Sequence, residues 1–179
     1  MISTSDTLVM VVDIQGKLAE IMENKELLFQ NVIKLIKGAK TLGIPIVWVE
    51  QNPQKMGETT TTIKNELDGL LPISKMSFSC CGEPTITARL RELARNNILL
   101  CGIETHVCIY QTSLDLIETG YKVHVPADAV SSRTLLNKEI GLARIQHAGG
   151  AITSTEMCLF ELLRTADHPS FKDILRIVK

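Results

Sequence analysis

ILLCGIETHVCIYQTSLDLIETG, residues 98–120, joins a short apolar run, a polar turn and an amphipathic segment in direct succession. Residues 98–101 have the pattern of a buried strand that stops at Gly102, and residues 107–119 have the apolar spacing of a helix. A strand that turns into a helix places the first helical N–H groups at the carboxyl edge of a sheet. The stretch therefore predicts one unit of a parallel α/β sheet.

Cys108 lies at the start of this predicted helix. The positive end of a helix dipole lowers the pKa of a nearby thiol and favours the thiolate, so the position suits a nucleophile. The alternative is that Cys108 is one more small buried hydrophobic residue, which is the ordinary role of a free cysteine. The stretch by itself does not decide between these two interpretations.

The rest of the chain repeats this alternation of strands and helices. The predicted strands are residues 8–12, 44–49, 72–74, 98–101, 121–125 and 151–153, and the predicted helices are residues 27–42, 63–70, 83–95, 107–119, 137–148, 156–165 and 169–177. The polar segment 51–62 predicts a long loop. This order predicts an α/β fold with three αβα layers and a doubly wound, Rossmann-like, six-stranded parallel sheet. No linker interrupts the pattern, so residues 1–179 are predicted to form a single domain.

Composition limits the classes of function. The chain is 45% hydrophobic, 22% charged and only 4% aromatic, with a formal net charge of -1. Without a basic stripe or stacking aromatics, nucleic acid is not expected as a partner. No apolar run is long enough to span a membrane, so a membrane partner is not expected either. The five cysteines form no CxxC pair, which favours reduced thiols and a cytoplasmic location, with an organelle left open.

Two charged residues follow predicted strands, as Cys108 does. Asp13 closes the first apolar run, and Lys75 follows the third strand. The carboxyl ends of parallel strands meet at one edge of a sheet, where ligands bind. A cysteine hydrolase needs a nucleophile, a proton carrier and a positive group, so the three residues together form a candidate site. The alternatives are that Asp13 caps the segment after it and that Lys75 is a solvated surface residue.

Five motifs carry a resemblance to a known family. They are VVDIQ at 11–15, SKMSFSC at 74–80, CGIETHVCIYQT at 101–112, PADAVSSR at 126–133 and HAGGAITSTE at 147–156. With these motifs in this order, the chain resembles the isochorismatase-like cysteine hydrolases, a family that includes nicotinamidases and carbamoylsarcosine amidohydrolases. Within the family it is most similar to the short isochorismatase domain-containing proteins. The resemblance spans nearly the whole chain.

The resemblance implies a catalytic triad of Cys108 as nucleophile, Asp13 as proton carrier and Lys75 as the charged partner. It also implies a cis peptide bond between Ile103 and Glu104, which turns the N–H groups of Glu104 and Cys108 toward an oxyanion. An isochorismatase-like fold and a homo-oligomer are implied as well. Because the pKa values of an ordinary carboxyl and an ordinary thiol differ by about 4–5 units, Lys75 and the helix end are expected to favour the thiolate.

Two departures from the family narrow the expected chemistry. Nicotinamidases hold a metal with an aspartate and histidines after the second strand, whereas residues 49–62 here contain neither His nor Asp. We therefore expect no catalytic metal and no cofactor. Isochorismatases that cleave a vinyl ether lack the catalytic cysteine, so the presence of Cys108 favours the amidase-type branch.

Polar residues beside the strand ends are candidates for a substrate pocket. They are Gln15, Glu50, Gln51 and His106. For each of them the alternative is an ordinary role in a surface loop. Arg133 is expected to pair with an acid such as Asp128 rather than with substrate.

The leading hypothesis is a cofactor-free cysteine hydrolase that cleaves a C–N bond of a small amide or ureido compound through a thioester. Two alternatives stay open. One is a non-catalytic binding or scaffold protein that retains the fold, and the other is a vinyl-ether hydrolase of the isochorismatase type. Fold alone does not choose among them, because one fold hosts many functions.

Overall fold

Short apolar runs form the strands of one seven-stranded sheet in the computed structural model, which describes residues 1–179. The strands are β1 (Thr7–Val12), β2 (Ile46–Gln51), β3 (Ile73–Lys75), β4 (Asn97–Ile103), β5 (Lys122–Pro126), β6 (Val130–Ser131) and β7 (Ala151–Thr153). Their order is β3-β2-β1-β4-β5-β7, with β6 paired to β4, and every pair is parallel. The predicted αβα fold is confirmed, and β6 is a seventh strand that was not predicted.

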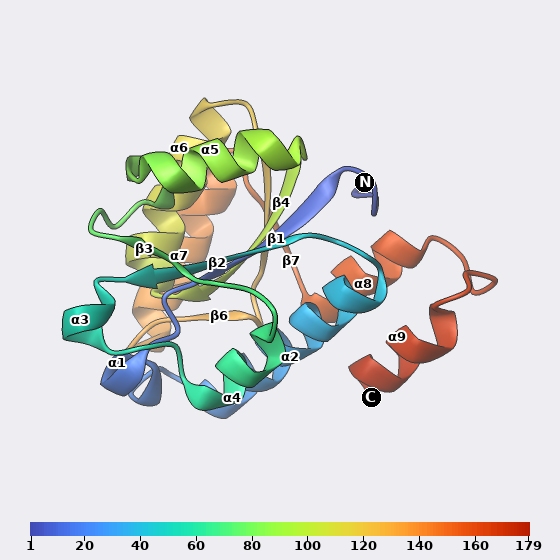
Figure 1. The fold of residues 1–179 in the computed structure, drawn as a ribbon, viewed down its shortest axis with the longest axis horizontal. Coiled ribbons are helices and arrows are strands. Elements are labelled where there is room, and N and C mark those ends of the chain that lie inside the picture. Colours follow the sequence, from blue (N-terminus) through green and yellow to red (C-terminus); the bar gives the residue numbers. More distant parts are fainter.

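Helices cover both faces of this sheet (Figure 1). They are α1 (Gly16–Glu20), α2 (Lys25–Thr41), α3 (Pro53–Met56), α4 (Thr61–Lys64), α5 (Pro84–Leu93), α6 (Tyr110–Glu118), α7 (Leu135–His147), α8 (Thr155–Leu163) and α9 (Phe171–Val178). The helices α2, α8 and α9 lie on one face and α5, α6 and α7 on the other, while α1 and α3 lie at one edge (Figure 1). No helix is long and apolar enough to cross a bilayer.

The central strands are buried on both faces, which is why they read as continuous apolar runs. Because side chains alternate along a strand, Val9 and Val11 of β1 pack in the core with α2 and α8. Leu8 and Met10 of the same strand pack in a second core with α5, α6 and α7. The two cores together fix the register of the sheet, because a slip of one residue would exchange every side chain between them.

Two segments near the carboxyl edge differ from the sequence prediction. The segment 51–62 is not a continuous loop, because Pro53 at the first helical position starts the short helix α3. A further short helix, α1, follows directly after β1 and was not predicted. Its five residues are too few to display a helical repeat in the sequence.

The chain reverses its winding direction at β1. It runs outward through β2 and β3, then returns to place β4 on the other side of β1. Such a switch point opens a crevice at the carboxyl ends of the two strands, where ligands bind in folds of this kind. Gly102 permits the close pairing of β4 with β1 at this point, because an added Cβ would lie 2.0 Å from the Val12 carbonyl oxygen.

Replacing Gly102 is therefore expected to break the pairing at the switch point. Gly102 has φ +123, so Gly102→Ala combines a left-handed backbone with a clash against a strand carbonyl. We expect the free energy of unfolding to fall by more than about 4 kcal/mol, in the range of severe core defects. Gly120→Ala is the matched control, since Gly120 has φ +93 and nothing within 4 Å of an added Cβ.

Urea denaturation followed by circular dichroism measures both variants. Gly120→Ala is expected to lose only about 1–2 kcal/mol, the cost of a left-handed backbone conformation. Equal losses for the two variants would contradict the importance of the close strand approach.

Candidate active site

Asp13 directly follows β1 and lines the crevice at the carboxyl edge of the sheet. Its backbone is left-handed, with φ 58, a conformation that costs about 1–3 kcal/mol in a residue other than glycine. The residue is buried, and its Oδ2 accepts a hydrogen bond from Lys75 Nζ at 2.7 Å. The other oxygen, Oδ1, is buried without a hydrogen-bond partner. Asp13 thus has one oxygen held by a cation and one available to a proton.

Lys75 ends β3 and carries a charge that is fully enclosed by protein. Its side chain is 0% exposed, and Nζ donates to Asp13 Oδ2 at 2.7 Å, Gln51 Oε1 at 2.6 Å and the Ser77 carbonyl at 3.3 Å. An ammonium group has three protons to donate, so these acceptors satisfy it completely. The side chain was predicted beside Asp13, and the structure brings the two together; the alternative of a solvated surface lysine does not hold.

Cys108 lies in a π-helical turn, Thr105–Ile109, that leads into α6. It is 7% exposed and lines the cavity described below together with Asp13. The expectation of a lowered thiol pKa was wrong. Burial and the Asp13 carboxylate raise the pKa of the Cys108 thiol above its usual range, and the opposing effect of Lys75 is smaller. The surroundings of the thiol in the free protein therefore favour its protonated form.

The carboxyl group of Asp13 is shifted in the direction that suits a proton acceptor. Burial raises the pKa of Asp13, against the lowering effects of Lys75 and of the Cys108 thiol. A carboxylate whose pKa is raised holds a proton better than an exposed one does. The thiol and the carboxylate are thus neighbours between which one proton can pass.

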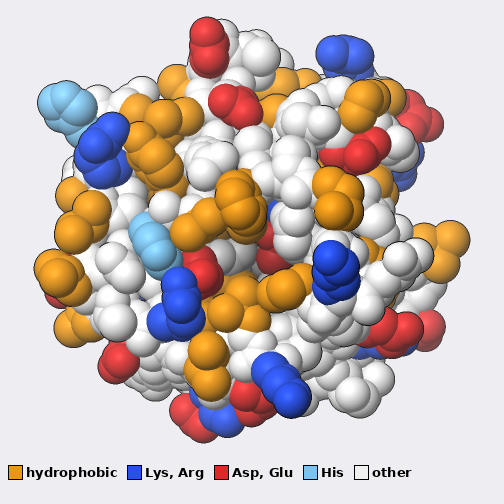
Figure 2. Space-filling view, turned by 90° about the vertical axis from the view of Figure 1, so that its left-hand side faces the viewer, with side chains coloured by type: hydrophobic (Ala, Val, Ile, Leu, Met, Phe, Trp, Pro, Cys, Tyr) orange, Lys and Arg blue, Asp and Glu red, His pale blue; other side chains and the backbone are white.

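A cavity of about 240 Å³ opens beside Asp13 and Cys108, and Lys75 lies outside its lining. It is lined by Asp13, Gln15, Leu18, Gln51, Asn52, Lys55, Met56, Phe78, Ile103, Glu104, Val107 and Cys108. Figure 2 looks onto the face that holds the carboxyl edge of the sheet, where hydrophobic side chains surround a central hollow. A larger cavity, of about 600 Å³, lies between the ends of α5 and α6 and contains none of the three residues.

Gln15 and Gln51 line the cavity, but their side chains are occupied in holding the scaffold. Gln15 Nε2 donates to the Gly57 carbonyl at 2.6 Å, and Gln15 Oε1 accepts from the Gln51 N–H at 2.7 Å. Gln51 Oε1 accepts from Lys75, and its Nε2 donates to the Met76 carbonyl at 2.8 Å. The two residues therefore fix the position of Lys75 and of the α3 segment.

The structure does not bring Glu50 and His106 into the cavity lining. Glu50 is buried behind it, where Oε1 accepts from the Thr59 N–H at 2.6 Å and from the Thr59 hydroxyl at 2.7 Å. His106 is half-buried, and its Nδ1 shares a hydrogen bond of 2.9 Å with Ser132 Oγ. Both residues support the loops around the cavity instead of facing it.

Glu104 follows β4 and stands at the mouth of the cavity. The peptide bond between Ile103 and Glu104 is cis. Glu104 Oε1 accepts from the Arg133 Nε at 3.0 Å and from the Arg133 N–H at 3.2 Å. Arg133 therefore pairs with an acid, as expected, but the acid is Glu104 and not Asp128, which accepts hydrogen bonds from Thr155.

Sequence reasoning missed the residues that shape the cavity walls. Leu18, Met56 and Phe78 supply apolar surface, and Lys55 supplies a positive charge. Leu18 and Met56 come from α1 and α3, the short helices that the sequence pattern did not reveal. No three His, Cys, Asp or Glu side chains gather anywhere in the chain as a group able to hold a metal ion.

Comparison with known proteins places this architecture in a family. The isochorismatase domain family matches residues 7–157. The chain is 40% identical over 151 residues to the secreted isochorismatase effector Isc1 of Phytophthora sojae, covering 81% of this chain and 71% of that protein. It is 37% identical over 172 residues to isochorismatase domain-containing protein 2 of Rattus norvegicus, covering 93% and 78%.

Solved structures agree with the sequence comparison. The structure described as the MAR1 ribonuclease from Caenorhabditis elegans superposes with a TM-score of 0.93 at 34% identity, covering 99% of this chain and 91% of that one. The matched family region contains Asp13, Lys75 and Cys108. The chain belongs to the isochorismatase family.

Proposed function

We propose that the protein is a cofactor-free cysteine hydrolase that cleaves a C–N bond of a small amide or ureido compound. Cys108 is the nucleophile, Asp13 the proton carrier and Lys75 the charge that holds Asp13 in place. The observation that supports the proposal most strongly is the difference between the two carboxylate oxygens of Asp13. Oδ2 accepts a hydrogen bond from Lys75, whereas Oδ1 is buried and has no hydrogen-bond partner. A group that only stabilised the fold would have no need of an open, buried acceptor.

The first chemical step transfers the thiol proton of Cys108 to Asp13 Oδ1 as the sulfur attacks the carbonyl carbon. The C=O electrons move to oxygen, and the N–H groups of Glu104 and Cys108 donate to that oxyanion. Loss of one such donor typically costs about 3–4 kcal/mol of transition-state stabilisation. Both residues line the cavity, so the reacting carbonyl group has access to them.

The second step breaks the C–N bond. Asp13 returns its proton to the leaving nitrogen, the amine departs and a thioester remains on Cys108. Asp13 then takes a proton from water, and the resulting hydroxide attacks the thioester carbon. The carboxylic acid is released as sulfur leaves and recovers its proton from Asp13. One water molecule is consumed, and the protein returns to its starting protonation state.

The raised pKa of Cys108 is consistent with this sequence of proton transfers. A thiol with a raised pKa reacts slowly with electrophiles until a neighbouring base takes its proton, and here Asp13 can do so when a reactive group enters the cavity. Lys75 opposes the rise in the Asp13 pKa and so favours the ionised carboxylate that accepts the proton. The nucleophile is generated inside the cavity by internal transfer.

Two other functions compete with this one. A scaffold protein would need the fold but not a Lys75–Asp13 ion pair beside the Cys108 thiol. A ribonuclease is the activity in the description of the Caenorhabditis elegans relative. We propose a small molecule as substrate instead of RNA, because the cavity measures about 240 Å³ and its lining offers one lysine.

We also propose that the protein is cytoplasmic, because all five of its cysteines are free. We propose further that it forms a homo-oligomer, because α7 exposes the hydrophobic side chains Leu135, Leu136 and Ile140.

Screening an amide and ureide library against the wild type and Cys108→Ala tests the reaction class. We expect release of ammonia or amine by the wild type and a loss of at least about 10³-fold in the variant, as for removal of a catalytic nucleophile. Cys158→Ala is the control, because Cys158 is also buried but lies in the other core. Activity that survives in Cys108→Ala, or cleavage of RNA with no amide turned over, would refute the proposal.

Alkylation of Cys108 by iodoacetamide, followed across pH by peptide mass spectrometry, tests the charge balance. The Asp13 carboxylate raises the thiol pKa, so Asp13→Asn should lower that pKa and speed alkylation at neutral pH. Lys75 lowers the thiol pKa, so Lys75→Met should slow alkylation, by about tenfold for each unit of pKa. Both variants should lose hydrolysis by about 10²–10⁴-fold.

The opposite signs of the two alkylation shifts separate this account from a structural role. Simple loosening of the site would speed alkylation in both variants. The other four thiols serve as internal references, since all of them are free cysteines in the same chain. Equal labelling of all five at neutral pH in the wild type would favour the scaffold function.

A further inference from the structure

Of the charged residues that line the cavity, Lys55 is the one whose charge is not paired with an opposite charge of the chain. Asp13 is paired with Lys75 at 2.7 Å, and Glu104 is paired with Arg133 at 3.0 Å. Lys55 lines the same cavity and forms no ion pair with any acid of the chain. The cavity therefore presents one uncompensated positive charge.

The backbone that carries Lys55 is fixed relative to the reacting groups. The Asn52 N–H donates to the Lys75 carbonyl at 2.9 Å, which ties the start of α3 to the end of β3. At its other end, the Gly57 carbonyl accepts from Gln15 Nε2 at 2.6 Å. An added Cβ on Gly16 would lie 2.3 Å from the Met56 carbonyl oxygen, which shows how closely α3 rests on the turn after Asp13.

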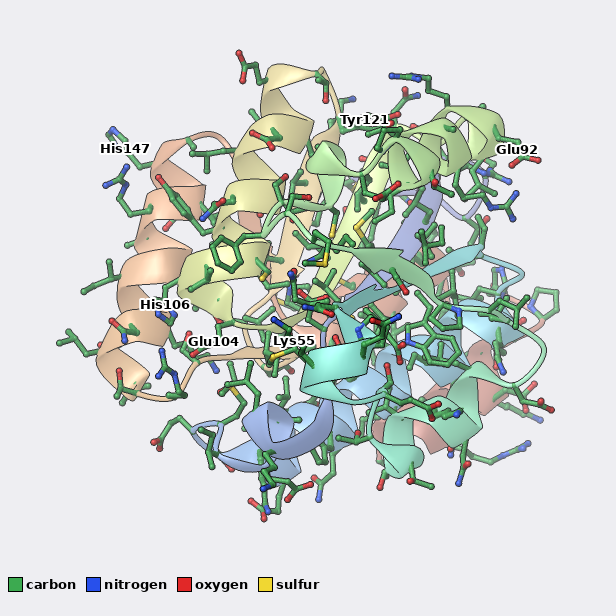
Figure 3. The ribbon with its side chains drawn as sticks, turned by 60° about the vertical axis from the view of Figure 1, so that its left-hand side comes forward. Lys55, Glu92, Glu104, His106, Tyr121 and His147 are labelled. Atoms are coloured by element: carbon green, nitrogen blue, oxygen red, sulfur yellow. The ribbon has the colours of Figure 1, made fainter.

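Lys55 is an exposed residue that also lines the cavity, so an anion bound to it there would lie against the cavity walls. Leu18, Met56 and Phe78 supply apolar surface beside it. Apolar walls reduce the screening of a charge by water, so an ion pair formed there is stronger than one on an open surface. Figure 3 shows the labelled Lys55 and Glu104 near each other in the middle of the view, and both residues line the cavity.

We propose that Lys55 binds a carboxylate of the substrate and so determines specificity. The substrate class is then a small amide or ureido compound that carries a single carboxylate away from the scissile C–N bond. One uncompensated cation matches one negative charge, and a cavity of about 240 Å³ admits only a small compound. Glu104 does not oppose such an anion strongly, because Arg133 neutralises it. This inference rests on the proposed function of Cys108 as an accessible nucleophile.

A pair of alkylating reagents tests the inference without requiring turnover. N-iodoacetylglycine carries a carboxylate where N-iodoacetylglycinamide carries a neutral amide, and the two are otherwise matched in shape. The measured quantity is the ratio of their rates at Cys108, divided by the same ratio for 2-mercaptoethanol. We expect the wild type to favour the anionic reagent about fivefold, and the preference to shrink at high salt as ions screen the charge.

Two lysine variants separate a local contact from a general effect of charge. Lys55→Met should remove the preference and bring the ratio to the value for 2-mercaptoethanol. Lys17→Met is the matched control, because Lys17 is an exposed residue of α1 without an ion pair and outside the cavity lining. It removes the same charge and should keep the wild-type ratio.

The outcomes that contradict the role of Lys55 differ from the outcome that contradicts the hydrolase proposal. An unchanged ratio in Lys55→Met, with Cys108 still labelled, would overturn the role of Lys55 and leave the hydrolase proposal standing. Equal losses in Lys55→Met and Lys17→Met would overturn it in the same way, since the effect would then be one of net charge. If neither reagent labels Cys108 in the wild type, the proposed function fails, and the inference about Lys55 fails with it.

Discussion

The buried ion pair between Lys75 and Asp13 is the constraint on which the site depends. Its atoms lie 2.7 Å apart, and both side chains are almost completely removed from water. Enclosing two charges is costly unless each finds partners, and losing one partner of such a pair typically costs about 3–5 kcal/mol. Here the surrounding chain provides a hydrogen-bond acceptor for each of the three protons of the Lys75 ammonium group. The one position that it leaves open, Asp13 Oδ1, is the position that a proton carrier needs.

The sheet brings these groups together because parallel strands end at a common edge. Asp13 directly follows β1, Lys75 ends β3, and the turn with Cys108 follows β4. Between β1 and β3 stands β2, whose last residue, Gln51, accepts a hydrogen bond from Lys75. Behind it, Glu50 binds Thr59, whose hydroxyl also accepts from Trp48 Nε1 at 2.8 Å. The loop that closes the cavity is thereby tied to the sheet.

Much of the fold could be read from the sequence because its signals are strong. Buried parallel strands appear as apolar runs, and the three site residues follow such runs directly. The segments that the sequence did not reveal are short: β6 has two residues and α3 has four, too few for any periodic pattern. Their positions depend on contacts with distant residues, which local sequence does not encode.

The pKa of the Cys108 thiol is another property that the local sequence does not determine. The start of a helix favours a thiolate, and that local effect is visible in the sequence. Burial and the neighbouring carboxylate oppose it, and they depend on the tertiary structure. The role proposed for Lys55 could not be predicted from the sequence for a similar reason. A lysine in a polar segment is ordinary until the structure shows which other charges around it are already paired.

The central claim is that Cys108 forms and breaks a covalent bond with the substrate carbon. The most direct test is rapid acid quenching during turnover of an amide or ureide found active in the screen, followed by mass spectrometry of the peptides. The account predicts a transient mass increase equal to the acyl or carbamoyl part of the substrate, located on Cys108 and absent from the other four cysteines. Turnover at full rate with no adduct on Cys108 at any quench time, and with Cys108→Ala equally active, would contradict it.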